Sequence, residues 1–460
     1  MGYELRDDTI TAICTPLGIG AIGIIRVSGS DAIPIVSTLF KPDGKINISE
    51  IKRGLVTGKV IDEHGKIIDN VLILIMKAPH SYTGEDVVEI QAHGNMLILK
   101  TIINALLKKG ARIAEPGEFT KRAFLNGKLD LTQAEAVLDQ ILAKTKKSLE
   151  LSRSAFEGRL SEKIQTYSDQ IKTILAQVEA IIDFPEEDIP KEIWEQSIHS
   201  LKHLSSDMEH LSETTEKGKI IREGVIVVIA GKPNVGKSSL FNALLQESRA
   251  IVSPYPGTTR DHLEEYVSLG GVPVRLIDTA GLREVSEPIE KEGIERAWKA
   301  VENAYTILFV VDATNINNED VQLYKSLKEN MDKTVLLVVN KTDLNENPEI
   351  PPLLLENIKT IVYTSAKTGV GIDELEKELV TVLLGEQEIS EDIILSHEHQ
   401  KHSLLRAKKC VENCIQKKEL SPELIAFELR EALHALGEIT GETATEELLD
   451  IIFSSFCIGK

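Results

Sequence analysis

The spacing of apolar residues divides the chain into blocks, and the first block ends near residue 118. Its apolar segments are short, rich in β-branched residues and separated by glycines, a pattern typical of strands. We expect strands within residues 9–15, 21–29, 53–61, 69–76 and 86–94. The clearest helical spacing covers residues 96–110 and stops at a glycine, a common helix terminator. The pattern predicts an α+β amino-terminal domain at residues 1–118.

The next block, residues 119–218, has apolar residues at intervals of three and four, as in amphipathic helices. We expect helices within residues 134–145, 160–184 and 194–218. Helical spacing returns in residues 383–460, with helices expected within residues 402–418, 422–440 and 444–456. Two helical blocks that flank another unit suggest one helical domain with that unit inserted into it.

The inserted unit, residues 219–382, alternates helical segments with continuous apolar runs. The runs cover residues 225–231, 274–281, 306–313, 334–340 and 359–366. Strands that are apolar throughout are buried on both faces, so the pattern predicts a parallel sheet covered by helices on each side. The expected protein is therefore multidomain, with an α/β unit inside a mainly helical domain.

Composition and charge exclude several classes of protein. The 460 residues include 52 Lys and Arg against 72 Asp and Glu, a net charge of −20, which argues against a general coat for nucleic acid or anionic membrane. The apolar runs are far shorter than the ~20 residues that span a bilayer, and the acidic amino terminus does not resemble a signal peptide. We expect a cytoplasmic protein that has no membrane contact.

Cysteine usage agrees with a reducing compartment. Cys14, Cys410, Cys414 and Cys457 are too few and too scattered for a disulfide framework, and they lack the paired spacing of a zinc site. Cys410 and Cys414 are four residues apart on an expected helix, which suits core packing as well as chemistry. No metal site is predicted from them.

A phosphate-binding loop follows the first apolar run of the inserted unit. Residues 231–238 read Gly-Lys-Pro-Asn-Val-Gly-Lys-Ser and precede an expected helix. Glycines let backbone N–H groups curl around phosphates at the amino end of a helix. Lys237 is expected to reach the β and γ phosphates, and the Ser238 hydroxyl to bind Mg²⁺.

Further motifs follow in the order of a guanine-nucleotide site. Asp278 begins an Asp-Thr-Ala-Gly motif, where a carboxylate can hold the Mg²⁺ shell. Asp343, in an Asn-Lys-Thr-Asp motif, can accept hydrogen bonds from the N1–H and 2-amino groups of guanine, which adenine lacks. The segment 365–367 supplies a backbone N–H for the guanine oxygen. The joint order and spacing predict GTP binding.

The segments around Asp278 carry the expected switches. Residues 253–261 read Ser-Pro-Tyr-Pro-Gly-Thr-Thr-Arg-Asp, and their threonines can place a hydroxyl on Mg²⁺ in the triphosphate state. Leu282 stands where small Ras-like GTPases carry the glutamine that orients the attacking water, a task for which a leucine is unsuited. A downstream carboxylate could do it, and the candidates are Glu284, Glu287, Glu290 and Glu292.

Lys237 is also predicted to be catalytic, and Ser238 and Thr259 are predicted to be Mg²⁺ ligands. The predicted contacts with GTP are Asn234, Val235, Gly236, Lys237, Ser238, Ser239, Ser253, Pro254, Tyr255, Pro256, Gly257, Thr258, Thr259, Asp278, Thr279, Ala280, Gly281, Asn340, Lys341, Asp343, Ser365, Ala366 and Lys367.

Two other patterns carry little weight. Residues 18–23 match the dinucleotide-binding glycine fingerprint, but a β-branched, strand-like run follows where that fingerprint requires a helix. Basic clusters at residues 144–147 and 399–409 could contact nucleic-acid phosphates, although such runs on amphipathic helices are usually solvated faces.

The chain resembles the tRNA-modification GTPase family called MnmE or TrmE over essentially all of its length. The most specific segments are residues 83–94, 115–136, 231–244, 256–261, 278–284 and the terminal Phe-Cys-Ile-Gly-Lys. The resemblance implies a folate-binding amino domain that forms a homodimer, and an inserted Ras-like G domain. It also implies a heterotetramer with the FAD enzyme MnmG. The two proteins together would install a carboxymethylaminomethyl group at C5 of the wobble uridine in certain tRNAs.

The resemblance further implies two sets of ligands. A potassium ion beside the nucleotide would be held at Asn234, Ser253, Tyr255 and Thr258, and Glu290 would orient the attacking water. 5-Formyltetrahydrofolate, or a related one-carbon folate, would lie at Arg26, Glu89, Lys128 and Lys460. A carboxylate can hydrogen-bond a pterin, and a cation can pair with the glutamate tail of a folate.

The carboxyl terminus is apolar and bears a cysteine, so we expect it to dock on another surface, which by resemblance is the folate site. Cys457 is then either a catalytic nucleophile, with its pKa lowered by Lys460 or Arg26, or a small packed hydrophobe. Two other functions stay open at this point. One is a ribosome- or RNA-associated GTPase switch with no direct part in modification, and the other is a one-carbon transferase with an incidental G domain.

Overall fold

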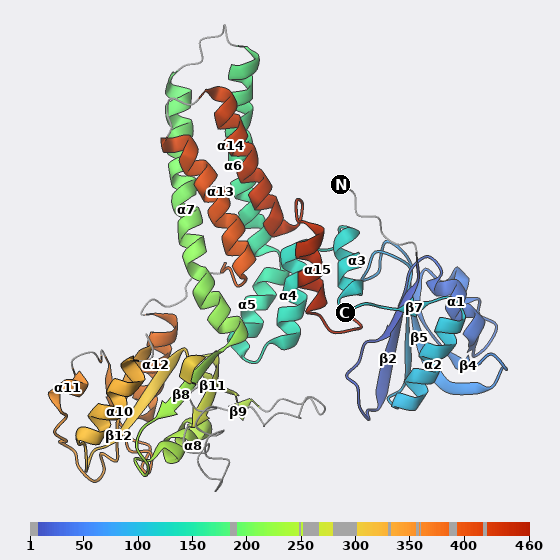
Figure 1. Cartoon of the computed structure of the whole chain (residues 1–460). Helices are drawn as coiled ribbons and strands as arrows, with labels where there is room; N and C mark the ends of the chain where they lie inside the picture. The colour runs from blue at the N-terminus through green and yellow to red at the C-terminus, as the bar shows by residue number, and fades with distance from the viewer. Residues whose placement is uncertain are drawn as a thin grey trace.

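The computed structural model describes residues 8–184, 191–247, 250–251, 266–278, 301–329, 333–355, 358, 360–385, 393–416 and 421–460, without the side chains of residues 191–194, 247, 250 and 251. Figure 1 shows three bodies: an amino-terminal sheet domain, an elongated helical domain, and an α/β domain at the end of the long helix α7. None of the described helices is long and apolar enough to cross a membrane.

The amino-terminal domain is a seven-stranded sheet covered by two helices. Its elements are β1 (Ile10–Ile13), β2 (Ile22–Ser28), α1 (Ala32–Leu39), β3 (Phe40–Pro42), a 3-10 turn (Ile48–Glu50), β4 (Arg53–Ile61), β5 (Ile67–Met76), β6 (Val87–His93), α2 (Met96–Lys108) and β7 (Arg112–Ile113). The strand order is β3-β4-β5-β6-β2-β1-β7, antiparallel except for β1 with β7. Buried residues of β2, β5 and β6 pack against α1 and α2. The α+β prediction is confirmed, while the short strands β3 and β7 were not predicted.

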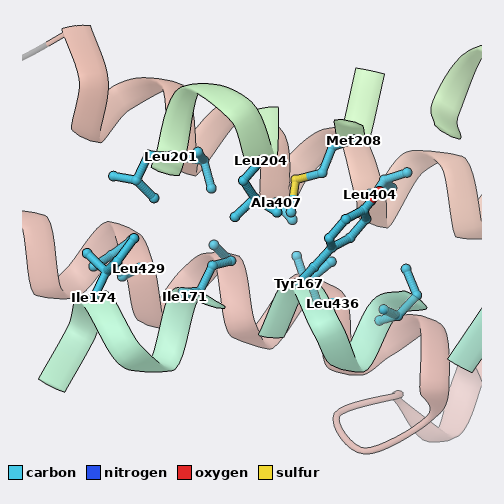
Figure 2. Close-up of a cluster of buried hydrophobic side chains, with 14 of the residues drawn as sticks. Tyr167, Ile171, Ile174, Leu201, Leu204, Met208, Leu404, Ala407, Leu429 and Leu436 are labelled. Carbon is cyan, nitrogen blue, oxygen red and sulfur yellow. The ribbon is translucent and has the colours of Figure 1, made fainter. Parts of the chain in front are cut away.

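The helical domain is assembled from both sides of the inserted unit. Its helices are α3 (Glu118–Leu125), α4 (Leu131–Leu142), α5 (Lys146–Phe156), α6 (Arg159–Asp183), α7 (Lys191–Glu223), α13 (Glu398–Gln416), α14 (Pro422–Thr440) and α15 (Glu446–Ser454). Figure 2 shows its core, where Tyr167 and Ile171 of α6 and Leu204 of α7 meet Leu404 of α13 and Leu436 of α14. The two helical blocks therefore form one domain, as predicted.

A second, smaller apolar cluster joins the carboxyl terminus to the start of this domain. Phe124 of α3 and Leu131 of α4 pack with Phe453 of α15 and with Phe456. Gly117 begins α3 in the left-handed conformation, with φ of 68°, and a Cβ there would lie 2.6 Å from the Phe453 carbonyl oxygen. Only glycine allows α15 to approach so closely.

The inserted domain has the predicted parallel sheet. Its elements are β8 (Val225–Ala230), α8 (Lys237–Glu247), β9 (Ala250–Ile251), β10 (Tyr266–Leu269), β11 (Val272–Asp278), β12 (Thr306–Asp312), α10 (Asn318–Glu329), β13 (Thr334–Asn340), α11 (Pro352–Leu355), β14 (Ile361–Tyr363) and α12 (Ile372–Leu384). The strand order is β14-β13-β12-β8-β11-β10-β9, and only the β9 and β10 pairings are antiparallel. Separate apolar clusters cover its two faces.

The boundaries predicted at residues 218 and 382 fall inside helices α7 and α12. Helix α7 continues to Glu223, beyond the boundary expected at residue 218, and α12 extends to Leu384, beyond residue 382. β8 is central, between β11 and β12, so the loop after it lies where the connections to neighbouring strands diverge. Ligands of open α/β sheets bind at that point, beyond the carboxyl ends of the strands.

Candidate functional site

The phosphate-binding loop joins β8 to α8 and is shaped by two glycines. A Cβ on Gly231 would lie 2.3 Å from the Val310 carbonyl oxygen, and a Cβ on Gly236 would lie 2.2 Å from Asn340 Nδ2. Asn234 has a positive φ of 63°, which asparagine tolerates better than most residues. Side chains are excluded at both glycines, so the loop can curl tightly before the helix.

Hydrogen bonds hold both of the polar side chains that end this loop. Lys237 is buried, and its Nζ donates to the carbonyl oxygens of Gly231 at 3.0 Å and Lys232 at 2.7 Å, so its ammonium group lies over the loop. The Ser238 hydroxyl donates to Asp278 Oδ2 at 2.7 Å, across the ends of β8 and β11. A hydroxyl and a carboxylate this close are hard oxygen donors suited to Mg²⁺. The two motifs are therefore adjacent in the structure, and their roles in Mg²⁺ binding stay predictions.

Asn340 joins the phosphate loop to the loops that would hold the base. Its side chain is 1% exposed, its Nδ2 donates to the Val235 carbonyl oxygen at 2.9 Å, and its Oδ1 accepts from Ala366 N at 3.0 Å. Lys341 adds a second link, because its Nζ donates to the Asn234 carbonyl oxygen at 2.7 Å and to Asp312 Oδ2 at 2.6 Å. The phosphate and base ends of the site are thus cross-linked through β13.

The base end forms a pocket around Asp343. Asp343 Oδ1 accepts a hydrogen bond from the Ser365 hydroxyl at 2.7 Å, which orients the carboxylate. The lining residues are Gly236, Ser239, Asn340, Lys341, Asp343, Leu344, Ser365, Ala366 and Lys367. Leu344 was not predicted, because a lone leucine after a polar motif carries no sequence signal. It is exposed, so it can provide an apolar surface for one face of a base.

Many predicted nucleotide contacts lie outside the described residues. They are Ser253, Pro254, Tyr255, Pro256, Gly257, Thr258, Thr259, Thr279, Ala280, Gly281 and the candidate water-orienting residue Glu290. Leu282, Glu284, Glu287 and Glu292 lie in the same undescribed segment. The roles predicted for them stay predictions.

A second polar site lies on the amino-terminal sheet. Arg26 of β2 and Glu89 of β6 are cross-strand partners, and Arg26 Nε donates to Glu89 Oε1 at 2.9 Å. The guanidinium carbon of Arg26 lies 5.1 Å from the centre of the Tyr82 ring and 5.5 Å from that of Phe119. Arg26 Nη1 is buried without a hydrogen-bond partner. An unsatisfied buried donor between two aromatic rings is a feature of ligand-binding sites.

The carboxyl terminus docks beside this pair. Pro116 and Ile458 form a β-bridge, and Phe119 N donates to the Lys460 carbonyl oxygen at 3.2 Å. Gly459, with φ of 101°, fits against β1, where a Cβ would lie 2.4 Å from the Ile13 carbonyl oxygen. Docking of the terminus on the surface of the amino domain is therefore confirmed.

Two thiols are present in this region, and only one was predicted. Cys457 is exposed, so it does not pack as a small hydrophobe. Cys14 follows β1, and no role at this site was predicted for it. It is distant from Arg26 and Lys460 in the sequence, and the fold brings the three residues together. Burial raises the pKa of the Cys14 thiol, and the nearby Arg26 and Lys460 oppose that rise.

Lys128 is not joined to the Arg26–Glu89 pair by any contact seen among the described residues. Its side chain is exposed, and its Nζ donates to the Pro79 carbonyl oxygen at 3.1 Å. Its Cγ lies close to Gly84, at 3.4 Å from the position a Cβ would take there. Lys128 thus contacts the loop of residues 79–84. The Tyr82 ring of the same loop lies against the guanidinium group of Arg26.

The patterns given little weight resolve in different ways. Strand β2 begins at Ile22, within residues 18–23, which confirms that no helix starts there as a dinucleotide-binding turn requires. Lys144 Nζ lies 3.6 Å from the centre of the Tyr266 ring, so this basic residue contacts the inserted domain. Cys410 and Cys414 belong to the helical core, where burial raises their pKa values to about 11 and about 12.

The central β8, the glycine loop, the Ser238–Asp278 pair and the pocket around Asp343 define a P-loop GTPase with a guanine-type base site. Comparison with known proteins makes the assignment more specific. Residues 131–457 match the MnmE helical domain family, and residues 9–128 match the family described as GTP-binding protein TrmE N-terminus. The two matches meet between residues 128 and 131, whereas our predicted boundary follows residue 118.

The chain is 45% identical to the tRNA modification GTPase MnmE of Desulforamulus reducens, over 99% of this chain and 100% of that protein. It is 44% identical to the same enzyme of Natranaerobius thermophilus, over 99% and 100%, and 45% identical to that of Aquifex aeolicus, over 98% and 100%. The chain belongs to the tRNA modification GTPase MnmE family. It is a GTP hydrolase acting in tRNA modification, and membership of this GTPase family implies GTP and Mg²⁺.

The geometry of Asp343 predicts the base specificity of the site. In Asp343→Asn the remaining side-chain oxygen can still accept from Ser365, but an amide N–H replaces the acceptor that guanine requires. We expect GTP binding to weaken by roughly 10²-fold or more and xanthosine triphosphate binding to improve, because xanthine offers an acceptor there. Nucleotide titration of both proteins measures this, and an unchanged preference would contradict it.

Proposed function

We propose that the chain is a potassium-dependent GTPase which, with an FAD-dependent partner resembling MnmG, installs a carboxymethylaminomethyl group at C5 of the wobble uridine in certain tRNAs. The observation that carries the proposal is the docking of the thiol-bearing carboxyl terminus beside the Arg26–Glu89 pair. The proposal therefore combines a one-carbon site in the amino domain with the GTPase of the inserted domain. Loss of the modified uridine from bulk tRNA in cells without this chain tests the proposal directly.

The described residues fit the proposed metal ions. Ser238 and Asp278 supply a hydroxyl and a carboxylate for the Mg²⁺ shell, and Thr259 of switch I is proposed as a further ligand. Asn234 is exposed on the turn of the phosphate loop, where its amide oxygen suits K⁺. Ser253, Tyr255 and Thr258 are proposed to complete that site. A potassium ion would supply positive charge where charge develops between the β and γ phosphates, as an arginine finger does.

The proposed roles in hydrolysis divide between the loops. Lys237, held over the loop carbonyls, binds the β and γ phosphates, and Asp343 with Ser365 orients the guanine. Glu290 orients the attacking water, since Leu282 lacks a polar group for this task. The cross-link through Asn340 keeps the phosphate and base ends at a fixed separation, so closure of the switches can act on a preformed platform.

The amino domain fits a one-carbon folate. Arg26 Nη1 needs an acceptor, Glu89 can accept from a pterin, and the Tyr82 and Phe119 rings offer apolar surface beside them. Lys128 and Lys460 are proposed to pair with the glutamate tail. The bound folate would supply a one-carbon unit, while these residues bind and orient it and Cys457 offers an exposed nucleophile.

The assembly is proposed to be a cytoplasmic homodimer formed through the amino domains, which joins MnmG in a heterotetramer. Two amino domains side by side would bring two folate sites together, while the G domains lie at the far ends of the α7 helices. The net charge of −20 means that tRNA contacts would be local, or would come from the partner.

Hydrolysis is expected to require potassium. An arginine finger in this position accelerates hydrolysis about 10³- to 10⁵-fold, and we expect K⁺ to give a large part of that effect. Turnover measured in K⁺ and in Na⁺ buffers of equal ionic strength checks this, with Asn234→Ala expected to remove most of the difference. Equal rates of hydrolysis in the two buffers would contradict the proposed potassium dependence.

Glu290 is expected to act only in the transition state. Glu290→Ala should lower kcat about 10²-fold or more while GTP affinity stays normal. Glu284→Ala and Glu287→Ala are matched controls from the same segment and should stay near the wild-type rate. If either control has the larger effect, the water-orienting role moves to that residue.

The docked terminus is expected to serve modification and not hydrolysis. Deletion of residues 457–460 should abolish tRNA modification and leave GTP hydrolysis largely intact. Gly459→Ala should have a similar effect, because its Cβ would collide with the Ile13 carbonyl oxygen. Cys457→Ser separates docking from chemistry. If that variant modifies tRNA at the normal rate, the thiol is not the nucleophile.

A further inference from the structure

Three potential metal ligands come together where the two parts of the helical domain meet, at the ends of α7 and α13 that face the G domain (Figure 1). They are Glu135 of α4 and His397 and His399, which bracket the start of α13. One ligand atom from each lies within 4.8 Å of the other two. The side chains are 3%, 16% and 24% exposed, so the group is largely shielded from solvent. The nucleotide and folate sites do not include these residues.

The two distances from Glu135 to the histidines match the ligand spacing around one small cation. Glu135 Oε1 lies 3.5 Å from His397 Nδ1 and 3.3 Å from His399 Nε2. A tetrahedral zinc ion with bonds of ~2.0–2.1 Å sets neighbouring ligand atoms about 3.3–3.4 Å apart. His399 Nε2 is buried and makes no hydrogen bond among the described residues, while Glu135 Oε1 lies 3.3 Å from it. In the neutral tautomer with its proton on Nδ1, this nitrogen would offer its lone pair to a metal ion on the side that faces the carboxylate.

The atoms that face away from this centre are held by other side chains. Gln400 Nε2 donates to Glu135 Oε2 at 2.8 Å, and Asp139 Oδ2 lies 3.0 Å from His397 Nε2. A carboxylate behind the non-coordinating nitrogen of a histidine fixes the tautomer and ring orientation that a metal ion needs.

In this structure the guanidinium group of Arg222 lies where a metal ion would bind to His397. Arg222 Nη1 contacts His397 Nδ1 and lies 2.8 Å from His397 Nε2. Arg222 is in the last turn of α7, which leads directly into β8 and the phosphate loop. A metal ion on His397 Nδ1 would have to displace Arg222, because both would bind the same lone pair.

We propose that Glu135, His397 and His399 form a binding site for Zn²⁺ or a similar first-row transition ion, in competition with Arg222. Imidazole nitrogens select such ions over Mg²⁺ and Ca²⁺, which prefer oxygen ligands. The three protein ligands leave a fourth position for water. A bound ion would link the start of α13 to α4 and would displace Arg222, in the last turn of α7, from His397. This proposal is independent of the proposed function.

The test uses the full-length chain carrying Cys457→Ser, freed of metal by a chelator and kept in excess Mg²⁺ without nucleotide. Co²⁺ is added and its d–d absorption followed, and Zn²⁺ is then titrated against it. We expect about one ion per chain with a tetrahedral Co²⁺ spectrum that Zn²⁺ abolishes. His399→Gln and Glu135→Gln should remove this spectrum, while the exposed His402→Gln serves as the matched control and should keep it.

Two further variants address the competition and the supporting contacts. Arg222→Gln should tighten Zn²⁺ binding, because the competing cation is gone. Asp139→Asn should weaken it about 10- to 100-fold, the usual effect of losing a carboxylate behind a metal-bound histidine. Circular dichroism confirms that each variant is folded, and His399→Gln and Arg222→Gln are independent tests if another variant is not. Absence of saturable binding, or binding that His399→Gln leaves unchanged, overturns the proposal and leaves an ion-pair network around Arg222.

Discussion

The packing of α6 and α7 against α13 and α14 is the constraint on which the rest of the structure depends. The helices of this core come from segments on either side of the G domain, so neither helical block can bury its apolar stripe alone. Tyr167 and Leu204 precede the G domain, while Leu404 and Leu436 follow it. The core therefore fixes both connections to the G domain, while the second cluster holds α15 and the docked terminus against α3 and α4.

Within the G domain, the buried amide of Asn340 has a comparable part on a smaller scale. It donates a hydrogen bond to the Val235 carbonyl oxygen in the phosphate loop and accepts one from the Ala366 N–H in the base loop. A buried amide leaves costly unpaired groups if either loop moves away, so the two loops behave as one unit. The platform for the nucleotide is thus rigid, whereas the hydroxyl of Ser238 and the carboxylate of Asp278 meet at its edge, where the switches begin.

The sequence predicted those parts of the molecule whose chemistry is local. The phosphate loop and the Asp343 motif place their ligands within a few residues, and the three domains follow from changes in apolar spacing. Cys14 and Leu344 were missed because a single cysteine or leucine gains meaning only from neighbours distant in the chain. The contact of Lys144 with Tyr266 and the group at His397 are likewise tertiary, since their partners lie on other elements. The apolar terminus could be expected to dock, but Gly459 against Ile13 shows the position only in three dimensions.

The two crossings of the chain between the helical domain and the G domain lie side by side. Arg222, just before the G domain, and His397, just after it, are in direct contact. An insertion whose ends are this close adds little loop-closure entropy to its host, so a short turn could replace the G domain and leave the helical core intact. The arrangement makes the GTPase a separable module, one that evolution could have acquired in a single insertion and that an engineer could exchange for another switch.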